Sequence, residues 1–370
     1  MMRMANRKLI GILTWREGTK FSEPKYFRNL IRQGKELGVK VFLFSHRDVL
    51  VKQRRVRGYI PDKQGGWSSK WFGWPDVVID RCRTRQPGYL SFRRQKHFLY
   101  ANSVFSNKWN ITDYLWEDET MRKWMPRTQI YSEKALHAYM EDFPIVYVKP
   151  GNGTGGRSVL KISRIKGGFL LVGRNKKIQH KTWQVTSRDA LVERVNLWVD
   201  QEQIRKGYFM VQQGLDLALL PDRPSDTRLL IQKNQQGKWS ITGLGVRVGV
   251  LKSATSNLHN GGKATDFISF MNNKFGEERG KEILHECHEL AYYTVKKLEE
   301  KYGRMLEFGL DIGIDTSGHI WLIEVNPKPG RDIFLGMGKA ELYKEAVRNP
   351  LAYAIWLAET ENKTVARYDK

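Results

Sequence analysis

The segment LEFGLDIGIDTSGHIWLIEVN, residues 306–326, contains two apolar runs separated by the polar stretch DTSG. Turn residues between two such runs predict a β-hairpin. In the simplest register, the first residue of the turn, Asp315, pairs with the last, Gly318. Side chains alternate between the two faces of a strand, so Ile323 and Val325 are expected to point together into a core.

The other face of this hairpin carries polar groups. Asp311 is expected opposite Leu322, and Gly309 opposite Glu324, which makes Asp311 and Glu324 diagonal neighbours roughly 7–8 Å apart at the backbone. Asn326 shares the face because it follows Glu324 by two residues. Carboxylates that converge beside a glycine suit Mg²⁺, which prefers oxygen ligands. The pattern favours a metal site at these three polar residues over a solvent-facing polar strand.

A glycine-rich stretch, GNGTGG, occupies residues 151–156 and matches G-x-G-x-x-G. A dinucleotide-binding fold needs a helix directly after the glycines, yet residues 157–162 alternate as a strand does. A P-loop is excluded because no Gly-Lys-Ser/Thr follows. Two interpretations stay open: a hairpin loop whose backbone N–H groups bind phosphates, or a plain hairpin with a surface lysine. The first interpretation involves Lys149, Gly151, Gly153, Thr154, Gly155 and Gly156.

The net charge is strongly positive, with 63 Lys and Arg against 39 Asp and Glu, a formal charge of +24. Residues 1–105 hold 23 of the basic and 7 of the acidic residues, and therefore two-thirds of the excess. Such a field attracts nucleic acid, an acidic polymer or an acidic substrate. A solvated basic surface explains the excess equally well. Nucleic acid is the least favoured partner, because the sequence shows no recognition motif.

The chain of 370 residues is long enough for two or three domains. The order strand, helix, strand, strand predicts a small α/β domain in residues 1–105, followed by further domains over 106–210 and 211–370. The strands are expected at 8–15, 39–44 and 75–80, and the helix at 24–37. A helix is also expected over 338–360.

Targeting and redox signals are few. No run reaches the roughly 18 apolar residues of a membrane span, and the N-terminal segment is interpreted as a first strand, not a signal peptide. Two cysteines cannot form a disulfide framework, which favours a reducing, cytoplasmic environment.

The glycine-rich hairpin, its lysine and the distant carboxylate hairpin together resemble the ATP-grasp superfamily. The resemblance covers about residues 1–335 and is strongest to the YheC/YheD-type, endospore coat-associated members. It is carried by the 306–330 segment and by RLLIQKNQQGKWSITGLGVRVG and NLHNGGKA. The resemblance implies an α/β fold class: a Rossmann-like pre-ATP-grasp domain, then a two-lobed ATP-grasp fold with a central lobe over 106–210 and a C-terminal lobe over 211–370.

The resemblance also implies roles for individual residues. ATP phosphates are expected at the glycine-rich loop, at Lys149 and at an earlier lysine, Lys108. The adenine is expected at the hinge VQQGL, where Gln212 and Gln213 replace a commoner Glu-containing form. The hinge residues are Gln212, Gln213 and Leu215. The Mg²⁺ or Mn²⁺ ligands are Asp311, Glu324 and Asn326. Residues near the transferred phosphate are Arg228, Arg247, Asn257, Gly261 and Gly262, with Asp226 beside them.

Three functions remain open at this stage. The first is a carboxylate–amine ligase that uses ATP and an acyl-phosphate intermediate to join small-molecule or peptide substrates, or an acidic polymer. The second is an ATP-dependent phosphotransferase. The third is a coat-associated ATP-binding protein with little turnover. The expected locations are the cytoplasm, including that of the mother cell, and the spore coat. The oligomeric state stays open.

Overall fold

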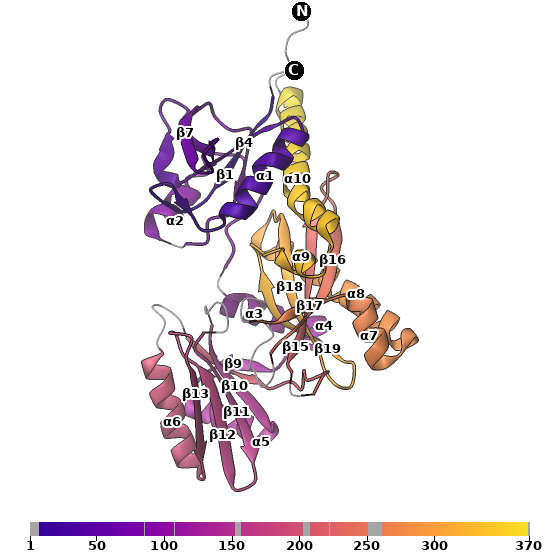
Figure 1. Cartoon of the computed structure of the whole chain (residues 1–370). Helices are drawn as coiled ribbons and strands as arrows, with labels where there is room; N and C mark the ends of the chain where they lie inside the picture. The colour runs from indigo at the N-terminus through magenta and orange to yellow at the C-terminus, as the bar shows by residue number, and fades with distance from the viewer. Residues whose placement is uncertain are drawn as a thin grey trace, which may run out of the picture.

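The computed structural model describes residues 7–84, 86–106, 108–151, 157–202, 208–221, 223–250 and 261–368. Its strands form three larger sheets and one two-stranded ribbon, and the three sheets follow one another along the chain (Figure 1). Within those ranges, no helix has both the length and the apolar character needed to cross a membrane. The α/β class, with an N-terminal domain and two lobes, is confirmed.

The N-terminal domain has the expected βαβ pattern. Strand β1 lies between β4 and β8 and pairs with both in parallel, so Ile10 stands opposite Val41 and Val77. Helix α1 begins at Pro24, where a missing backbone N–H costs nothing, and packs Phe27 and Leu30 into the core. The elements are β1 (Leu9–Leu13), β2 (Arg16–Glu17), β3 (Lys20–Phe21), α1 (Pro24–Glu36), β4 (Lys40–Phe44), η1 (His46–Asp48), β5 (Val49–Leu50), β6 (Arg55–Pro61), β7 (Trp67–Phe72), β8 (Val77–Asp80) and α2 (Pro87–Arg94).

The central lobe is an antiparallel sheet in the order β13-β12-β11-β10-β14-β9. Helices α5 and α6 pack on one face of it, where Leu136 and Val195 meet Val148 and Leu160 in one core. Ser132 and Ser187 cap the two helices by accepting backbone N–H groups. Along this part of the chain the elements are α3 (Lys108–Glu117), α4 (Glu119–Arg122), β9 (Thr128–Ile130), α5 (Glu133–Asp142), β10 (Ile145–Pro150), β11 (Val159–Ile165), β12 (Gly168–Arg174), β13 (His180–Val185), α6 (Arg188–Gln201) and β14 (Phe209–Gln213). Of these, α3 and α4 pack Ile111, Leu115 and Met121 into the core of the C-terminal lobe.

The C-terminal lobe is a second antiparallel sheet, in the order β17-β16-β15-β18-β19. Alternation along β15 divides its side chains: Leu229 and Ile231 face α7 and α8, while Leu230 faces α9. The sheet is therefore covered on both faces. The elements are β15 (Ser225–Lys233), β16 (Trp239–Val248), β17 (Lys263–Thr265), α7 (Phe267–Phe275), α8 (Glu277–Tyr302), β18 (Glu307–Ile314), β19 (Ile320–Asn326), α9 (Asp332–Gly336) and α10 (Ala340–Tyr368).

Helix α10 connects the C-terminal lobe with the N-terminal domain. It starts on the C-terminal lobe and runs along α1 (Figure 1). Its residues Val347, Leu351, Ala354 and Leu357 are buried in the same core as Ile10 of β1. The expected tail helix is confirmed and is longer than predicted. The domain limits at 105/106 and 210/211 stay a prediction, but the core of the first domain contains residues from the last.

Candidate functional site

The turn of the 306–326 hairpin differs from the expected one. Asp315 pairs with His319, because the Asp315 N–H donates to the His319 carbonyl over 3.0 Å. Three residues, 316–318, form the loop, and Gly318 ends it with a φ of 85°. A three-residue hairpin loop commonly places a left-handed glycine at this position. The predicted pairing of Asp315 with Gly318 is therefore wrong by one residue.

A β-bulge shifts the register once more. Ile312 stands opposite Leu322, but Asp311 stands opposite Glu324, so Ile323 is the extra residue on β19. A bulge places two residues against one and changes which face the following side chains occupy. Asp311 and Glu324 are therefore directly opposed, not diagonal. Leu322 and Val325 are in the core, whereas Ile323 is half-buried over Gly313, so its predicted place in the core is wrong.

The bulge gathers the expected metal ligands on one face. Gly309 stands opposite Asn326, two pairs beyond Asp311 and Glu324 and therefore on the same face. A Cβ at Gly309 would lie 2.7 Å from Pro329 Cβ and 2.9 Å from Arg228 Nη1. Glycine is therefore required here, because the Arg228 side chain and the segment after β19 occupy the space over its Cα.

Two arginines from neighbouring strands converge on Asp311. Arg228 lies opposite Asp311 across the β15–β18 pair, and its Nε and Nη2 donate to the two carboxylate oxygens over 2.6 and 3.2 Å. Arg247 Nη2 lies 3.0 Å from Asp311 Oδ1. The same guanidinium makes a bidentate pair with Asp226, with both distances 2.6 Å. These side chains form an ion-pair network on one face of the sheet.

Burial and charge act against each other in this network. Burial alone would raise the pKa of Asp311, but Arg228 and Arg247 outweigh it and hold that pKa below its usual value. For Arg247, burial would lower the pKa, but Asp311 and Asp226 raise it instead. The Asp311 carboxylate and the Arg247 guanidinium are therefore charged at neutral pH.

The site fits a cation by the kind of its donors. Two carboxylates face each other, and the amide oxygen of Asn326 lies two pairs away on the same face, which is the oxygen set that Mg²⁺ prefers. A carboxylate has about four lone-pair directions, and Asp311 already makes four contacts, the fourth from Asn326 Nδ2 at 3.3 Å. Among described residues, no three or more His, Cys, Asp or Glu are grouped to hold a metal. A cation would therefore replace a contact of Asp311 and need further oxygens.

Three of the expected phosphate-binding residues, Lys108, Lys149 and Gly151, lie where the central lobe meets α3. Gly151 accepts the backbone N–H of Trp109 over 3.2 Å, which places the first turn of α3, with Lys108, beside the end of β10. Lys149 Nζ donates to Gln212 Oε1 over 2.6 Å, and Gln212 Nε2 donates to Thr128 Oγ1 over 2.7 Å. The remaining loop residues, Gly153, Thr154, Gly155 and Gly156, lie outside the described residues.

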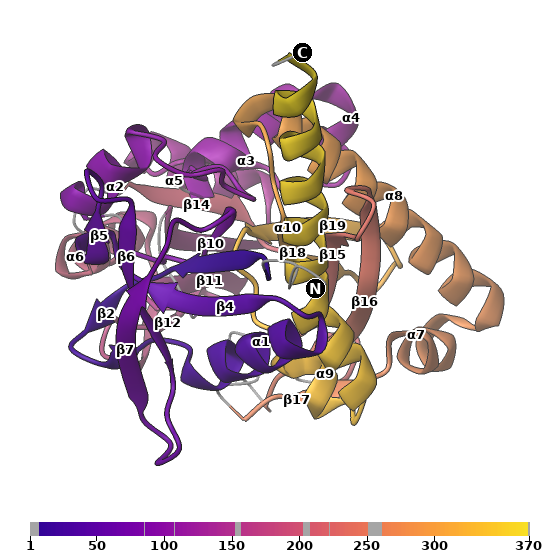
Figure 2. The same cartoon turned by 90° about the horizontal axis from the view of Figure 1, so that it is seen from above.

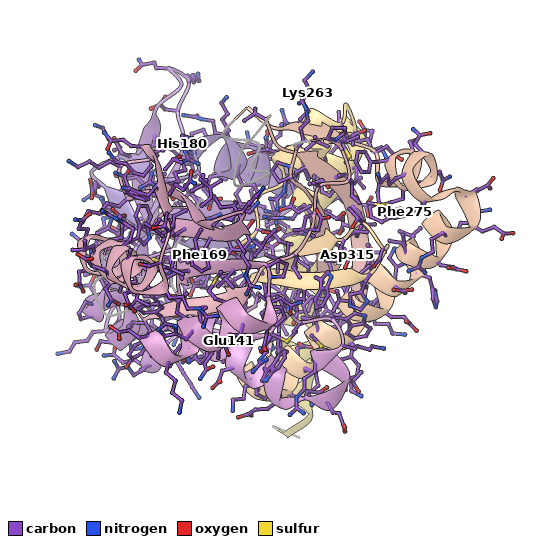
Figure 3. All side chains as sticks on the ribbon, turned by 90° about the horizontal axis from the view of Figure 1, so that it is seen from below. Glu141, Phe169, His180, Lys263, Phe275 and Asp315 are labelled. Carbon is purple, nitrogen blue, oxygen red and sulfur yellow. The ribbon has the colours of Figure 1, made fainter. Side chains whose placement is uncertain are left out.

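The hinge is the last part of β14 and the segment after it. Gln213 is bonded to Arg127 twice, through its own N–H and through its side-chain oxygen. A cavity of about 540 Å³ borders Gln213, Trp116 and Trp321. Asp315, another lining residue, is labelled in Figure 3 between residues of the central lobe and Phe275. This cavity contains none of the expected metal ligands. Leu215 is half-buried just beyond β14.

The remaining residues expected near the transferred phosphate, Asn257, Gly261 and Gly262, precede β17 in the sequence. Gly261 has a φ of 86°, and Gly262 leads directly into β17. There Ala264 stands opposite Arg247. This glycine pair therefore reaches the sheet beside the arginine network. Asn257 lies outside the described residues.

Residues that connect the site to the N-terminal domain were not predicted. Arg81, 1% exposed at the end of β8, donates to Glu23 over 2.8 Å and to Glu307 over 2.9 Å. Arg331 also pairs with Glu307, and the guanidinium groups of Arg81 and Arg331 both lie over the Tyr26 ring, 4.8 and 4.5 Å from its centroid. The sequence showed Arg81 only as part of a basic cluster, since its partner is 226 residues away.

A second contact joins the same parts. Lys328, two residues after Asn326, lies 3.1 Å from Asp80 Oδ1. Asp80 is fully buried and also pairs with Arg93 at 2.9 Å. Glu307 begins β18 and Lys328 follows β19, so both ends of the hairpin with the expected metal ligands are fixed to the N-terminal domain.

A family model described as YheC/D-like ATP-grasp matches residues 97–357. The chain belongs to this ATP-grasp family. The match includes both lobes and most of α10, and it confirms the resemblance seen in the sequence. It also agrees with the described site, because ATP-grasp proteins use ATP and Mg²⁺.

Curated relatives match over most of their length. The endospore coat-associated protein YheD of Bacillus subtilis (strain 168) is 27% identical over 366 residues, which cover 95% of this chain and 79% of YheD. The endospore coat-associated protein YheC of the same organism is 23% identical over 337 residues, which cover 87% of this chain and 90% of YheC. This ATP-grasp chain therefore resembles both proteins outside the two lobes as well.

Solved structures share the fold. D-cycloserine synthetase DcsG superposes with a TM-score of 0.54 at 11% identity and covers 95% of this chain and 99% of its own. The D-alanine–D-alanine ligase of Coxiella burnetii has a TM-score of 0.53 at 10% identity, with 98% and 99% covered. Because the superpositions cover 95% and 98% of this chain, the similarity in fold includes the N-terminal domain.

Proposed function

We propose that this protein is an ATP-dependent carboxylate–amine ligase that works through an acyl phosphate. The observation that carries the proposal is one sheet face on which two opposed carboxylates, Asp311 and Glu324, lie beside Asn326 and two arginines. That face combines the means to hold a cation with the means to hold a phosphoryl group. Family membership and ligase neighbours such as the D-alanine–D-alanine ligase support it.

The reaction divides into two displacements. A carboxylate oxygen of the first substrate attacks the γ-phosphorus of ATP, the bond to the ADP oxygen breaks, and an acyl phosphate forms. The amine nitrogen of the second substrate then attacks the acyl carbon, loses a proton and displaces phosphate. Neither step needs a nucleophilic side chain, so the protein contributes by positioning the substrates and neutralising charge.

Arg247 and Arg228 are the residues proposed to contact the transferred phosphoryl group. A guanidinium has donors in a planar fork that matches phosphoryl oxygens. Asp226 holds Arg247 by both ends of its carboxylate, which fixes the direction of the fork. Lys149 is proposed to meet the phosphates from the other lobe, where Gln212 orients its ammonium group.

Asp311, Glu324 and Asn326 are proposed to hold Mg²⁺ or Mn²⁺ together with nucleotide phosphates. A bound divalent cation neutralises phosphate charge and makes the γ-phosphorus easier to attack. Arg228 and Arg247 already neutralise Asp311. We therefore expect cation and nucleotide to bind together, because the arginines can then pair with the phosphates while Asp311 pairs with the cation. The cytoplasm or the spore coat is the proposed setting, by analogy with the coat-associated relatives.

Two measurements test the proposal. The melting temperature should rise with a nonhydrolysable ATP analogue plus Mg²⁺, and rise less with either alone, because ligands that bind the native state stabilise it by mass action. Incubation with ATP, Mg²⁺ and pooled amino acids and acidic peptides should then give products whose mass equals two substrates minus water. No thermal shift at millimolar nucleotide would refute ATP binding. A product that gains only a phosphoryl group would instead identify a phosphotransferase.

A further inference from the structure

The β6–β7 hairpin projects from the N-terminal domain. Figure 2 shows its tip extending beyond the rest of the molecule. At its base Phe72 stacks on Phe42 with 4.3 Å between ring centroids, and at its tip Trp67 packs against Phe21. Between these fixed ends β7 is exposed at residues 68–71, which lie on both faces of the strand. A ribbon that is rigid at both ends and exposed between them can present a fixed surface to a partner.

Cations without acidic partners line this ribbon. Residues 49–74 contain six Lys and Arg and one acidic residue, Asp62, whose carboxylate accepts N–H groups within the hairpin turn. All six cations are exposed, and in the described chain none forms an ion pair: Lys52, Arg54, Arg55, Arg57, Lys63 and Lys70. Other arginines of the same domain are paired, among them Arg16 and Arg81.

The three arginines are held in place by aromatic rings and a hydroxyl group. Arg55 lies 5.6 Å from the centroid of Trp71, and Arg54 lies 5.0 Å from that of Trp74. Arg57 Nε donates to Ser69 Oγ over 3.2 Å. Trp71 is 45% exposed, as an interface residue is. Arg55 and Arg57 are two residues apart on one face, so their spacing matches alternate side chains of an extended chain.

Strand β7 also has an unpaired edge. It pairs with β6 on one side, and no other described strand pairs with it. Its six residues present about 20 Å of backbone N–H and C=O groups at that edge. Such an edge is where an extended peptide can add to a sheet, with main-chain hydrogen bonds giving affinity and side chains giving specificity.

We propose that the β6–β7 hairpin binds an extended acidic peptide segment by strand addition to β7, with Arg55 and Arg57 pairing to acidic side chains at alternate positions. The unpaired edge favours a peptide over nucleic acid, because a polynucleotide backbone has phosphate acceptors but no N–H donors to pair with the C=O groups of the edge. The proposal does not depend on ATP or on turnover. It would, however, give the proposed ligase a site that concentrates an acidic polypeptide substrate.

Fluorescence polarisation with a labelled octapeptide of alternating Glu and Thr tests this on the full chain without nucleotide. Its comparators are a peptide of four Glu followed by four Thr, and a single-stranded DNA pentanucleotide of the same charge. Two further peptides carry N-methyl groups on all Glu amides or on all Thr amides. In strand addition only alternate residues direct their N–H groups to β7, so one of these two peptides must lose binding.

The variant Arg55→Ala/Arg57→Ala removes two exposed charges, and Lys134→Ala/Lys274→Ala is the control with the same charge change on α5 and α7. The first variant should raise the Kd for the alternating peptide by about fivefold or more. The control should raise it by less than about twofold, since exposed ion pairs are individually weak. The proposal is overturned if DNA or the block peptide binds as tightly, if both N-methylated peptides bind normally, or if the two variants behave alike. The cations would then act only to protect an edge strand from aggregation.

Discussion

Asp311 receives four contacts from three side chains in the absence of any ligand. Removing these contacts would leave a buried carboxylate without partners, which is costly. Asp311 can therefore bind a cation only if the cation replaces one of the four contacts. Glu324, directly opposite, is only half-buried. At the scale of single residues, the two carboxylates therefore differ: Asp311 contacts both arginines, and Glu324 is the more accessible of the two proposed metal ligands.

Glu324→Gln should abolish ATP turnover and leave the fold intact. The change keeps the shape of the side chain but removes a negative charge from a site that must hold a divalent cation. Phosphate release with Mg²⁺ measures the loss, and the melting temperature without ligands reports on the fold. Asn326→Asp is the matched control and should be milder, because an oxygen ligand remains. Full activity of Glu324→Gln would mean that the carboxylate is structural.

The pH dependence of stability should report on Asp80. Burial alone would raise the pKa of this carboxyl group, but Lys328 and Arg93 lower it. A depressed pKa contributes stability above the unfolded-state value of about 3.9 and loses it as the pH falls toward the folded-state value. Asp80→Asn should destabilise the protein by about 3–5 kcal/mol at pH 7, as removal of one partner of a buried ion pair does.

The difference between wild type and Asp80→Asn should then narrow as the pH falls from about 5, because protonated Asp80 resembles asparagine. Urea unfolding at several pH values measures the free energy of unfolding of both proteins, and hence this difference. As a control, Asp142→Asn removes one partner of an exposed pair and should change stability by less than about 1 kcal/mol at every pH. A difference that stays constant down to pH 3.5 would show that the Asp80 carboxylate has no stabilising role.

At the scale of elements, the hairpin β18–β19 shows what sequence reasoning can and cannot find. The polar residues at Asp311, Glu324 and Asn326 are visible because they interrupt apolar strands. The register is not visible, because it depends on a three-residue loop and on a bulge at Ile323, and neither leaves a distinct pattern. Two errors of one residue each still left the three polar groups on a common face.

Gly309→Ala should lower kcat by about tenfold or more, because displacements of about 1 Å at a catalytic site can cost this much or more. The added Cβ would clash with Pro329 and with Arg228, so the arginine or the segment after β19 must move. Steady-state kinetics measures the effect, and Gly73→Ala, which meets no atom within 4 Å, is the control. If Gly309→Ala and Gly73→Ala have the same kcat, the position of the Arg228 side chain does not matter for turnover.

At the scale of the whole molecule, contacts distant in sequence decide the assembly. The βαβ order, the glycine-rich hairpin and the family resemblance all predicted the three parts. The ion pair of Arg81 with Glu307 could not be predicted, since nothing local to either residue indicates a partner 226 positions away. The same holds for Leu351 of α10, whose apolar periodicity indicates burial but not the domain that buries it.

Leu351→Ala should therefore destabilise the N-terminal domain from the other end of the chain. Leu351 is fully buried among residues of β1, β8 and α1, and a cavity there should cost about 2–5 kcal/mol. Hydrogen exchange followed by mass spectrometry should show faster exchange in β1, β4 and α1 as well as in α10, because local stability follows the packing unit and not the order in sequence. Leu136→Ala is the control of equal size, since Leu136 is also fully buried but belongs to the central-lobe core. It should speed exchange in α5, β10 and β11 and leave β1 unchanged. If Leu351→Ala speeds hydrogen exchange in α10 alone, the N-terminal domain is stable without the helix, and the shared core does not contribute to its stability.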